Sequence, residues 1–235
     1  MNLKISDFVF KIDDNDALKK FYNRQGYLTE SPPDFTIHIS EKDIKTDMEI
    51  LGGDRFFNRA TDLAIHRKIA ELLPLHNAIL LHSACFDVDG IGIAFAAHSG
   101  TGKTTHMQLW QHFLKNRMTV VNGDKPIIRF FDNEPDVPYA YGTPWNGKER
   151  LGCNMRTRLK HICFIERSEK NFCESIDKNA AVNLILNQVY IPKDSVAMAK
   201  TLELVDKILS CCQLWKIKCN VSPDSAEISF KTIFS

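Results

Sequence analysis

Residues 78–105 read AILLHSACFDVDGIGIAFAAHSGTGKTT and carry the strongest structural signals in the chain. Two apolar runs flank Asp89 and Gly90, and an Asp-Gly pair between such runs is typical of a two-residue β-hairpin loop. If these two residues form the loop, Val88 lies opposite Ile91. The sequence therefore predicts an antiparallel hairpin in the middle of this stretch.

The register of this hairpin predicts the position of one histidine. Counting outward from the turn, His82 lies opposite Ala97, and cross-strand partners have Cβ atoms about 5 Å apart. A slip of one residue would turn His82 to the other face of the sheet. An isolated histidine beside a strand is more often structural. The predicted pairing favours a functional role for His82 instead, as an acid/base or a phosphate contact.

The second strand of the hairpin leads into a glycine-rich loop, residues 97–105. The loop follows the phosphate-loop pattern, with alanine in place of the first glycine. Gly100 and Gly102 permit the tight path that turns backbone N–H groups toward phosphate oxygens. Lys103 adds a charge near the outer phosphates, and the Thr104 hydroxyl suits Mg²⁺. A helix predicted after the loop would add its N-terminal donors. We therefore expect a nucleotide to bind through Ser99, Gly100, Thr101, Gly102, Lys103, Thr104 and Thr105. The alternative is a glycine-rich loop that matches the pattern by chance.

Two later segments supply further candidate residues. The apolar run MTVV ends in NGDKP, which contains Asp124. A carboxylate at such a strand end commonly reaches the Mg²⁺ of a phosphate loop, although Asp124 could also be a simple turn residue. The segment GTPWNGKERLG, residues 142–152, is expected to form a long loop. In this loop, Lys148 or Arg150 could contact phosphate or an acidic substrate, and Trp145 could stack on a ring. A packed surface loop with a buried tryptophan is an equally weighted alternative.

Composition narrows the class of protein. The chain has 235 residues, of which 44% are hydrophobic and 25% charged, as in ordinary globular proteins. The net charge of +1 gives no indication of a nucleic-acid or membrane partner. No run approaches the roughly 20 apolar residues of a membrane span, and no signal peptide is expected. The seven cysteines are scattered and include no C-x-x-C pair. We therefore expect reduced thiols in a cytoplasmic protein.

The chain is expected to divide near residue 55. DFVFKI and FTIHIS alternate as strands do, and ISEKDI and MEILGGDRFF follow them. These patterns predict a small β-rich module over residues 1–55. RATDLAIHRKIAELL predicts a helix that stops at Pro74. Over residues 56–235 helices and strands mix, which predicts an α/β domain with one main sheet. Strands are expected at residues 127–131, at LKHICFIER and at LWKIKCNV, with a Pro- and Asp-rich turn after residue 131. Helices are expected at KTTHMQLWQHFLKN, NAAVNLILNQVY and DSVAMAKTLELVDKIL.

The stretch LLHSACFDVDGIGIAFAAHSGTGKTTH, with VVNGDKP after it, resembles the catalytic core of HPr kinase/phosphorylase and its relatives. That fold is shared with phosphoenolpyruvate carboxykinase. In the family a histidine precedes the hairpin and the loop reads Ser-Gly-x-Gly-Lys-Ser/Thr, which matches His82 and residues 99–104. The family also carries a paired Asp-Asp. Here that place reads Gly123, Asp124 and Lys125, so one acid is missing, and whether a reverse, phosphorylase reaction exists stays open.

The resemblance implies a P-loop kinase domain of the HPr kinase/phosphoenolpyruvate carboxykinase type, with a mixed sheet and flanking helices. It implies MgATP bound at the loop, Lys103 neutralising charge, and Mg²⁺ held by Thr104 and Asp124. Asp124 would take the acceptor proton with help from His82. The implied reaction is ATP-dependent phosphorylation of a hydroxyl, with a serine of a protein or peptide as the leading acceptor. A small-metabolite kinase and a nucleotide-binding regulatory module without transfer are the alternatives. GTP and pyrophosphate stay open as donors. Relatives are often oligomers, so a homo-oligomer is also an expectation.

Overall fold

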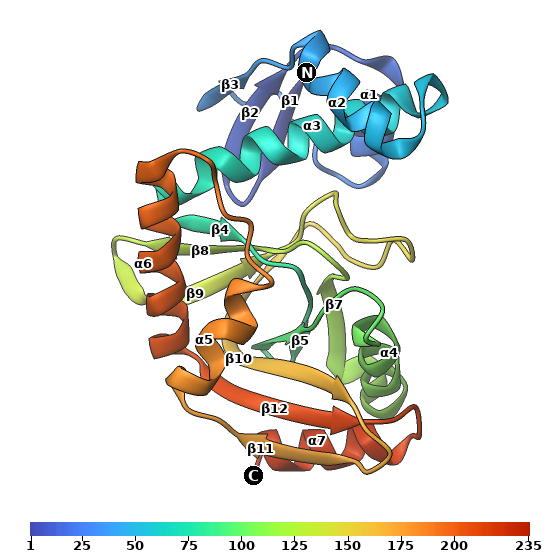
Figure 1. Cartoon of the computed structure of the whole chain (residues 1–235), viewed down its shortest axis with the longest axis vertical. Helices are drawn as coiled ribbons and strands as arrows, with labels where there is room; N and C mark the ends of the chain where they lie inside the picture. Colours follow the sequence, from blue (N-terminus) through green and yellow to red (C-terminus); the bar gives the residue numbers. More distant parts are fainter.

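The computed structural model describes residues 1–235, whose strands form two sheets. A three-stranded sheet near the N-terminus lies above a curled nine-stranded sheet flanked by helices (Figure 1). The larger sheet has the order β4-β8-β9-β10-β6-β5-β7, with β12 beside β10 and β11 beside β12. The predicted α/β class with one main mixed sheet is confirmed.

The N-terminal layer differs from the expected β-rich module. It contains β1 (Asn2–Ile5), β2 (Phe8–Ile12), α1 (Asp16–Arg24), β3 (Phe35–Ile37), α2 (Glu41–Leu51) and the 3-10 turn η1 (Asp54–Phe56). Helix α2 forms within the expected β-rich module, and Ser40 and Asp43 make a reciprocal capping box at its start. Gly52 ends the helix in the left-handed conformation, with φ 98°. The prediction of β-rich content is therefore wrong.

Helix α3 (Phe57–Leu72) joins the two layers and is followed by the 3-10 turn η2 (Leu73–His76). The α-helix stops just before Pro74, as predicted. Ile65 and Ile69 are fully buried in a core that also contains side chains of the small sheet and of β4, β8 and β9. This shared core orients the N-terminal layer on the large sheet. The boundary at residue 55 stays a prediction.

The large sheet contains the predicted hairpin. Its strands are β4 (Ala78–Leu80), β5 (Ser83–Val88), β6 (Ile91–Ala96), β7 (Met118–Asn122), β8 (Ile127–Phe131), β9 (Glu134–Tyr141), β10 (Arg156–Arg167), β11 (Phe172–Ser175) and β12 (Gln213–Cys219). In β5 and β6, Val88 pairs with Ile91, so the predicted register is confirmed. Asp89 and Gly90 both have positive φ, 52° and 87°, as the favoured two-residue hairpin turn requires.

Two strands of the large sheet lie where none was predicted. Strand β9 replaces the expected Pro- and Asp-rich turn, and β11 pairs with β12. The prolines of β9 fall where its register with β8 shifts, between the pairs Arg129–Tyr139 and Phe131–Glu134. Only the last residues of β9 pair with β10. Prolines are tolerated at such irregular positions because no ladder hydrogen bond is lost. The proline pattern was therefore misleading here.

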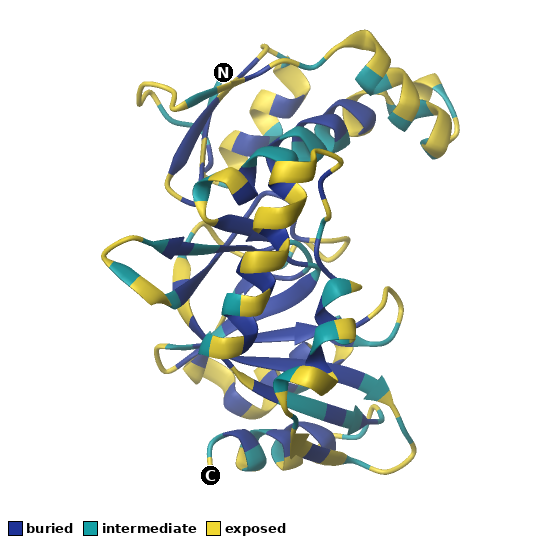
Figure 2. Ribbon diagram, turned by 60° about the vertical axis from the view of Figure 1, so that its left-hand side comes forward, coloured by how far each residue is buried: buried dark blue, intermediate teal, exposed yellow.

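Helices cover both faces of the large sheet (Figure 1). They are α4 (Lys103–Leu114), α5 (Lys178–Leu186), α6 (Ser195–Cys211) and α7 (Asp224–Ile233), with a 3-10 turn η3 (Lys115–Arg117) after α4. Successive side chains of β6 point to opposite faces of the sheet. Phe95 packs in the core beneath α4 and α7, and Ala94 packs in the core beneath α5 and α6. Asp194 caps α6, as predicted. Figure 2 shows the resulting pattern, with mostly buried strands and exposed outer helix faces.

No helix in the structure combines the length and the apolar character that a membrane span needs.

Candidate active site

The topology of the large sheet brings three chain segments together at the ends of its neighbouring strands β5, β6 and β7. Strand β5 lies between β6 and β7 and runs antiparallel to both. The ends of β6 and β7 therefore meet at the edge where β5 begins. His82 immediately precedes β5, Ala97 follows β6, and Asp124 follows β7. The backbone N–H of Ser83 donates to the carbonyl of Asp124, 3.0 Å away. The predicted approach of His82 to the glycine-rich loop is confirmed by its contact with Lys103.

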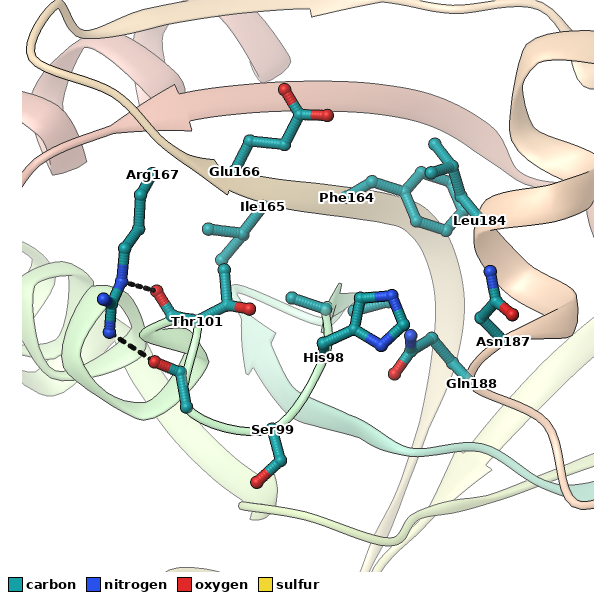
Figure 3. A pocket seen from close by; sticks show the side chains of 13 residues that line it. His98, Ser99, Thr101, Phe164, Ile165, Glu166, Arg167, Leu184, Asn187 and Gln188 are labelled. Atoms are coloured by element: carbon teal, nitrogen blue, oxygen red, sulfur yellow. Dashed lines mark hydrogen bonds between the residues drawn. The ribbon is translucent and has the colours of Figure 1, made fainter.

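The loop between β6 and α4 has the backbone that its glycines predict. Gly100 and Gly102 have φ values of 79° and 116°, a region that other residues rarely adopt. Gly102 caps α4, and no side chain accepts a hydrogen bond at this helix start. The free N–H groups and the helix dipole therefore suit an anion. Arg167, at the end of β10, donates to the carbonyl oxygens of Thr101, 3.1 Å away, and of Gly100 (Figure 3).

Lys103 is buried at the start of α4, with 7% of its surface exposed. Its Nζ donates to the carbonyl of Ala97 at 2.7 Å and lies 3.2 Å from Nε2 of His82. Burial lowers the pKa of Lys103 to about 8, against the opposing attraction of Asp124. The ammonium is thus folded against the loop carbonyls, next to the place where outer phosphates are expected.

Asp124 contacts two nitrogen groups through one oxygen. Its Oδ1 lies 3.2 Å from Nε2 of His82 and 3.1 Å from Nζ of Lys125. Burial alone would raise the pKa of Asp124, but the hydrogen bond to His82 and the charge of Lys125 outweigh it and lower the pKa to about 2. His82 Nε2 faces both Lys103 and Asp124, so it accepts from the first or donates to the second, according to its protonation.

Asn122 organises the turn that holds Asp124, and the sequence analysis missed it. Its side chain is completely buried at the end of β7. Oδ1 accepts from the backbone N–H groups of Asp124 at 2.8 Å and Lys125 at 2.6 Å, and Nδ2 donates to Oγ1 of Thr143 at 2.9 Å. An asparagine that bonds the backbone two residues ahead forms an Asx-turn. The NGD triplet was the signal that could have identified it.

The loop over residues 142–152 buries Trp145 and leaves Lys148 and Arg150 exposed. Trp145 is 8% exposed, lies 4.6 Å from the His66 ring and donates to Oδ1 of Asp62 at 3.0 Å. The prediction that Trp145 stacks on a ligand ring is therefore wrong, because its faces are used in the core. Lys148 and Arg150 are exposed and form no ion pair. Arg150 lines a different groove, beside α1.

The predicted magnesium ligands are consistent with the chemistry that the ion requires. Thr104 is partly buried in the first turn of α4, and Thr105 is exposed. Mg²⁺ usually takes only one or two protein carboxylates and completes its shell with water and phosphate oxygens. Asp124, a single carboxylate at the mouth of the glycine-rich loop, is the type of protein ligand that such an ion takes. Whether Thr104 and Asp124 share an ion stays a prediction.

A pocket of about 670 Å³ adjoins the glycine-rich loop (Figure 3). It is lined by the loop, the end of β10 and α5 with the residues after it: Ala96, Ala97, His98, Ser99, Gly100, Thr101, Phe164, Ile165, Glu166, Arg167, Leu184, Asn187 and Gln188. Gln188 is 5% exposed, and its Oε1 has no hydrogen-bond partner. An unpaired buried acceptor is costly. Phe164 and Leu184 add apolar surface.

Comparison with known proteins gives little further help. No protein-family model matches the chain, and no curated protein matches it. Among solved structures, it is similar to the HPr(Ser) kinase/phosphatase from Coxiella burnetii, with a TM-score of 0.37 and 8% sequence identity. The match covers 66% of this chain and 94% of that chain. This is a distant resemblance only, so a function has to be argued from the site itself.

Proposed function

We propose that this protein is a kinase that transfers the γ-phosphate of ATP to a hydroxyl group, most readily the serine of a protein or peptide. One observation carries the proposal. Nε2 of His82 lies 3.2 Å from both Nζ of Lys103 and Oδ1 of Asp124 at the mouth of a glycine-rich loop that starts a helix. A cation, a carboxylate and a titratable ring beside an anion-binding loop are the groups that phosphoryl transfer uses.

The nucleotide side of the proposal rests on the loop and the adjoining pocket. The phosphates would lie against the free N–H groups at the start of α4, where Lys103 neutralises charge on the outer oxygens. The pocket beside the loop would receive the nucleoside. This arrangement supports ATP over pyrophosphate, which has no nucleoside to fill the pocket.

In the transfer, the acceptor oxygen forms a bond to the γ-phosphorus. The bond from that phosphorus to the bridging oxygen breaks, and ADP leaves. The hydroxyl proton passes to Asp124, and His82 is placed to hold it next. A carboxylate with a pKa of about 2 is a weak base. It is adequate where the transition state is loose and the proton moves late. Mg²⁺, when bound through Thr104 and Asp124, would supply additional positive charge at the phosphates.

One contact favours a second candidate function. Lys125 Nζ lies 3.1 Å from the same Asp124 oxygen that would accept the proton. A fixed positive charge there weakens the basicity of the carboxylate. The protein would then be a nucleotide-dependent binding module that holds ATP without transferring phosphate.

A labelling experiment separates these functions. The protein and its Lys103→Met variant are incubated with Mg²⁺, γ-phosphate-labelled ATP and a cell extract from the source organism, and products are separated by size. Acid-stable label in a protein or peptide, absent with the variant, is the expected result. Label in a small molecule would indicate a metabolite kinase instead. ATP binding without transferred label, across fractionated extracts, would favour the binding module.

A further inference from the structure

We propose that the groove between α1 and the loop over residues 146–154 binds an acidic peptide segment of the phosphate acceptor. The inference rests on the proposed kinase function and names its class of substrate. The groove has a volume of about 600 Å³ and is separate from the pocket at the glycine-rich loop. It is lined by Ala17, Lys20, Phe21, Arg24, Gln25, Tyr27, Asn146, Arg150, Gly152, Cys153 and Asn154.

The charge on this groove is entirely positive. Lys20 and Arg24 lie one turn apart on α1, and Arg150 contributes a third cation from the opposite side. All three side chains are exposed, and none takes part in an ion pair. No aspartate or glutamate lines the groove. Unpaired cations gathered in one concave surface favour an anionic occupant.

The walls of the groove are held together by side-chain hydrogen bonds between distant parts of the chain. Asn146 Nδ2 donates to Oε1 of Gln25 at 3.0 Å, and Asn154 Nδ2 donates to the carbonyl of Gly26 at 2.8 Å. These bonds attach both ends of the loop to the end of α1. The groove is therefore a built feature of the fold, in which the two walls keep a defined separation.

The same loop is attached to the turn of Asp124 on its other side. The N–H of Gly123 donates to the carbonyl of Leu151 at 2.8 Å. At Gly147, an added Cβ would lie 3.2 Å from Cβ of Asp124, so the two backbones are in close contact. One loop therefore lines the groove with some of its residues and contacts the turn of Asp124 with others, which links the groove to the proposed transfer site.

The arrangement of the cations favours a peptide over a small anion. A small anion is usually held by donors that converge on it, whereas these three cations are exposed and stand on two separate elements. The same groove is also lined by the apolar and aromatic residues Ala17, Phe21 and Tyr27. A peptide whose carboxylates alternate with apolar side chains matches that combination of a charged rim and an apolar floor.

Binding of a labelled peptide tests the inference without ATP. The probe is a short fluorescein-labelled peptide with one serine, several glutamates and a phenylalanine, compared with the same peptide carrying glutamine for glutamate. Fluorescence anisotropy gives its affinity for the wild-type chain and for the Lys20→Glu/Arg24→Glu variant. The control is Lys42→Glu/Lys45→Glu on α2, which makes the same charge change at exposed lysines outside the groove. Thermal unfolding establishes that each variant is folded.

The groove variant is expected to bind the acidic peptide roughly tenfold more weakly, because two cations that would pair with its carboxylates become anions that repel them. The control variant should bind as the wild type does, and the glutamine peptide should bind weakly to all three proteins. Equal affinity of the groove and control variants would overturn the inference. So would displacement of the peptide by millimolar inorganic phosphate at constant ionic strength, which identifies a small-anion site. Peptide binding is measured without ATP and so does not depend on phosphate transfer. A protein that binds the acidic peptide but transfers no phosphate would therefore contradict only the kinase proposal. Equal phosphorylation of acidic and neutral peptides would contradict only the groove.

Discussion

Nε2 of His82 lies 3.2 Å from Oδ1 of Asp124, although the hairpin, the glycine-rich loop and α4 lie between the two residues in the sequence. The contact exists because β5 begins at the edge where β7 ends. It joins the only two acid–base groups at the mouth of the glycine-rich loop that the sequence analysis had selected. Four consequences of this arrangement can be measured.

Replacing Lys103 by methionine should remove nucleotide binding. The variant keeps the length of the side chain but loses the charge that faces the phosphates. We expect ATP affinity to fall about 10- to 100-fold, because hydrogen bonds to charged groups are worth about 1.5–3 kcal/mol. Isothermal titration calorimetry measures the loss. Lys160→Met, at an exposed position on β10, is the matched control and should bind ATP normally. Unchanged ATP affinity in the Lys103 variant would contradict the proposed phosphate site.

Replacing Asp124 by asparagine should separate transfer from binding. The amide keeps the shape but cannot take a proton or a full share of metal charge. We expect the transfer rate to fall about 10²- to 10⁴-fold, the range for loss of a general base. The affinity for ATP without Mg²⁺ should stay within a few-fold. Labelled-ATP assays and calorimetry give the two numbers, with the exposed Asp136→Asn as control. A fully active Asp124→Asn variant would exclude this carboxylate from the chemistry.

Burial of Lys103 should produce a stability profile that rises at alkaline pH. Its pKa is lowered from 10.5 to about 8 in the folded chain. Between these values the unfolded chain holds a proton that the folded chain has released, so the free energy of unfolding increases with pH. Urea unfolding of the wild type and of Lys103→Met across that window isolates the contribution. As pH rises, the free energy of unfolding of the wild type should increase relative to that of Lys103→Met. Parallel profiles would mean that the ammonium is not desolvated.

Removing the Asn122 side chain should destabilise the turn of Asp124. Asn122→Ala leaves the N–H groups of Asp124 and Lys125 without their acceptor and the Thr143 hydroxyl without a donor. We expect the free energy of unfolding to fall by about 2–4 kcal/mol, since each orphaned buried group costs about 1–3 kcal/mol. Urea denaturation measures the change. Asn133→Ala, in the exposed turn between β8 and β9, is the control. A loss no larger than that of the control would show that water replaces the amide.

Much of the site could be predicted because its determinants are local. The register of the hairpin follows from Asp89 and Gly90, and that register alone placed His82 beside the loop. The N-cap of α6 at Asp194 was likewise predicted from neighbouring residues. Helix α2 was missed although its capping box, formed by Ser40 and Asp43, is a local signal that the sequence carries. The prolines of β9 misled because only the pairing with β8 shows that they fall at an irregularity.

The sequence by itself determined the hairpin, the glycine-rich loop and the residue types that face it, since turn chemistry and side-chain periodicity act over a few residues. Only the tertiary structure decided which distant groups share a surface. Packing of α3 beneath the small sheet buries Trp145 against His66 and Asp62, which excludes it from the ligand site. The same packing places Arg150 across a groove from Lys20 and Arg24. Such convergence depends on how whole layers bury their apolar faces against each other, and that is a property of the assembled core.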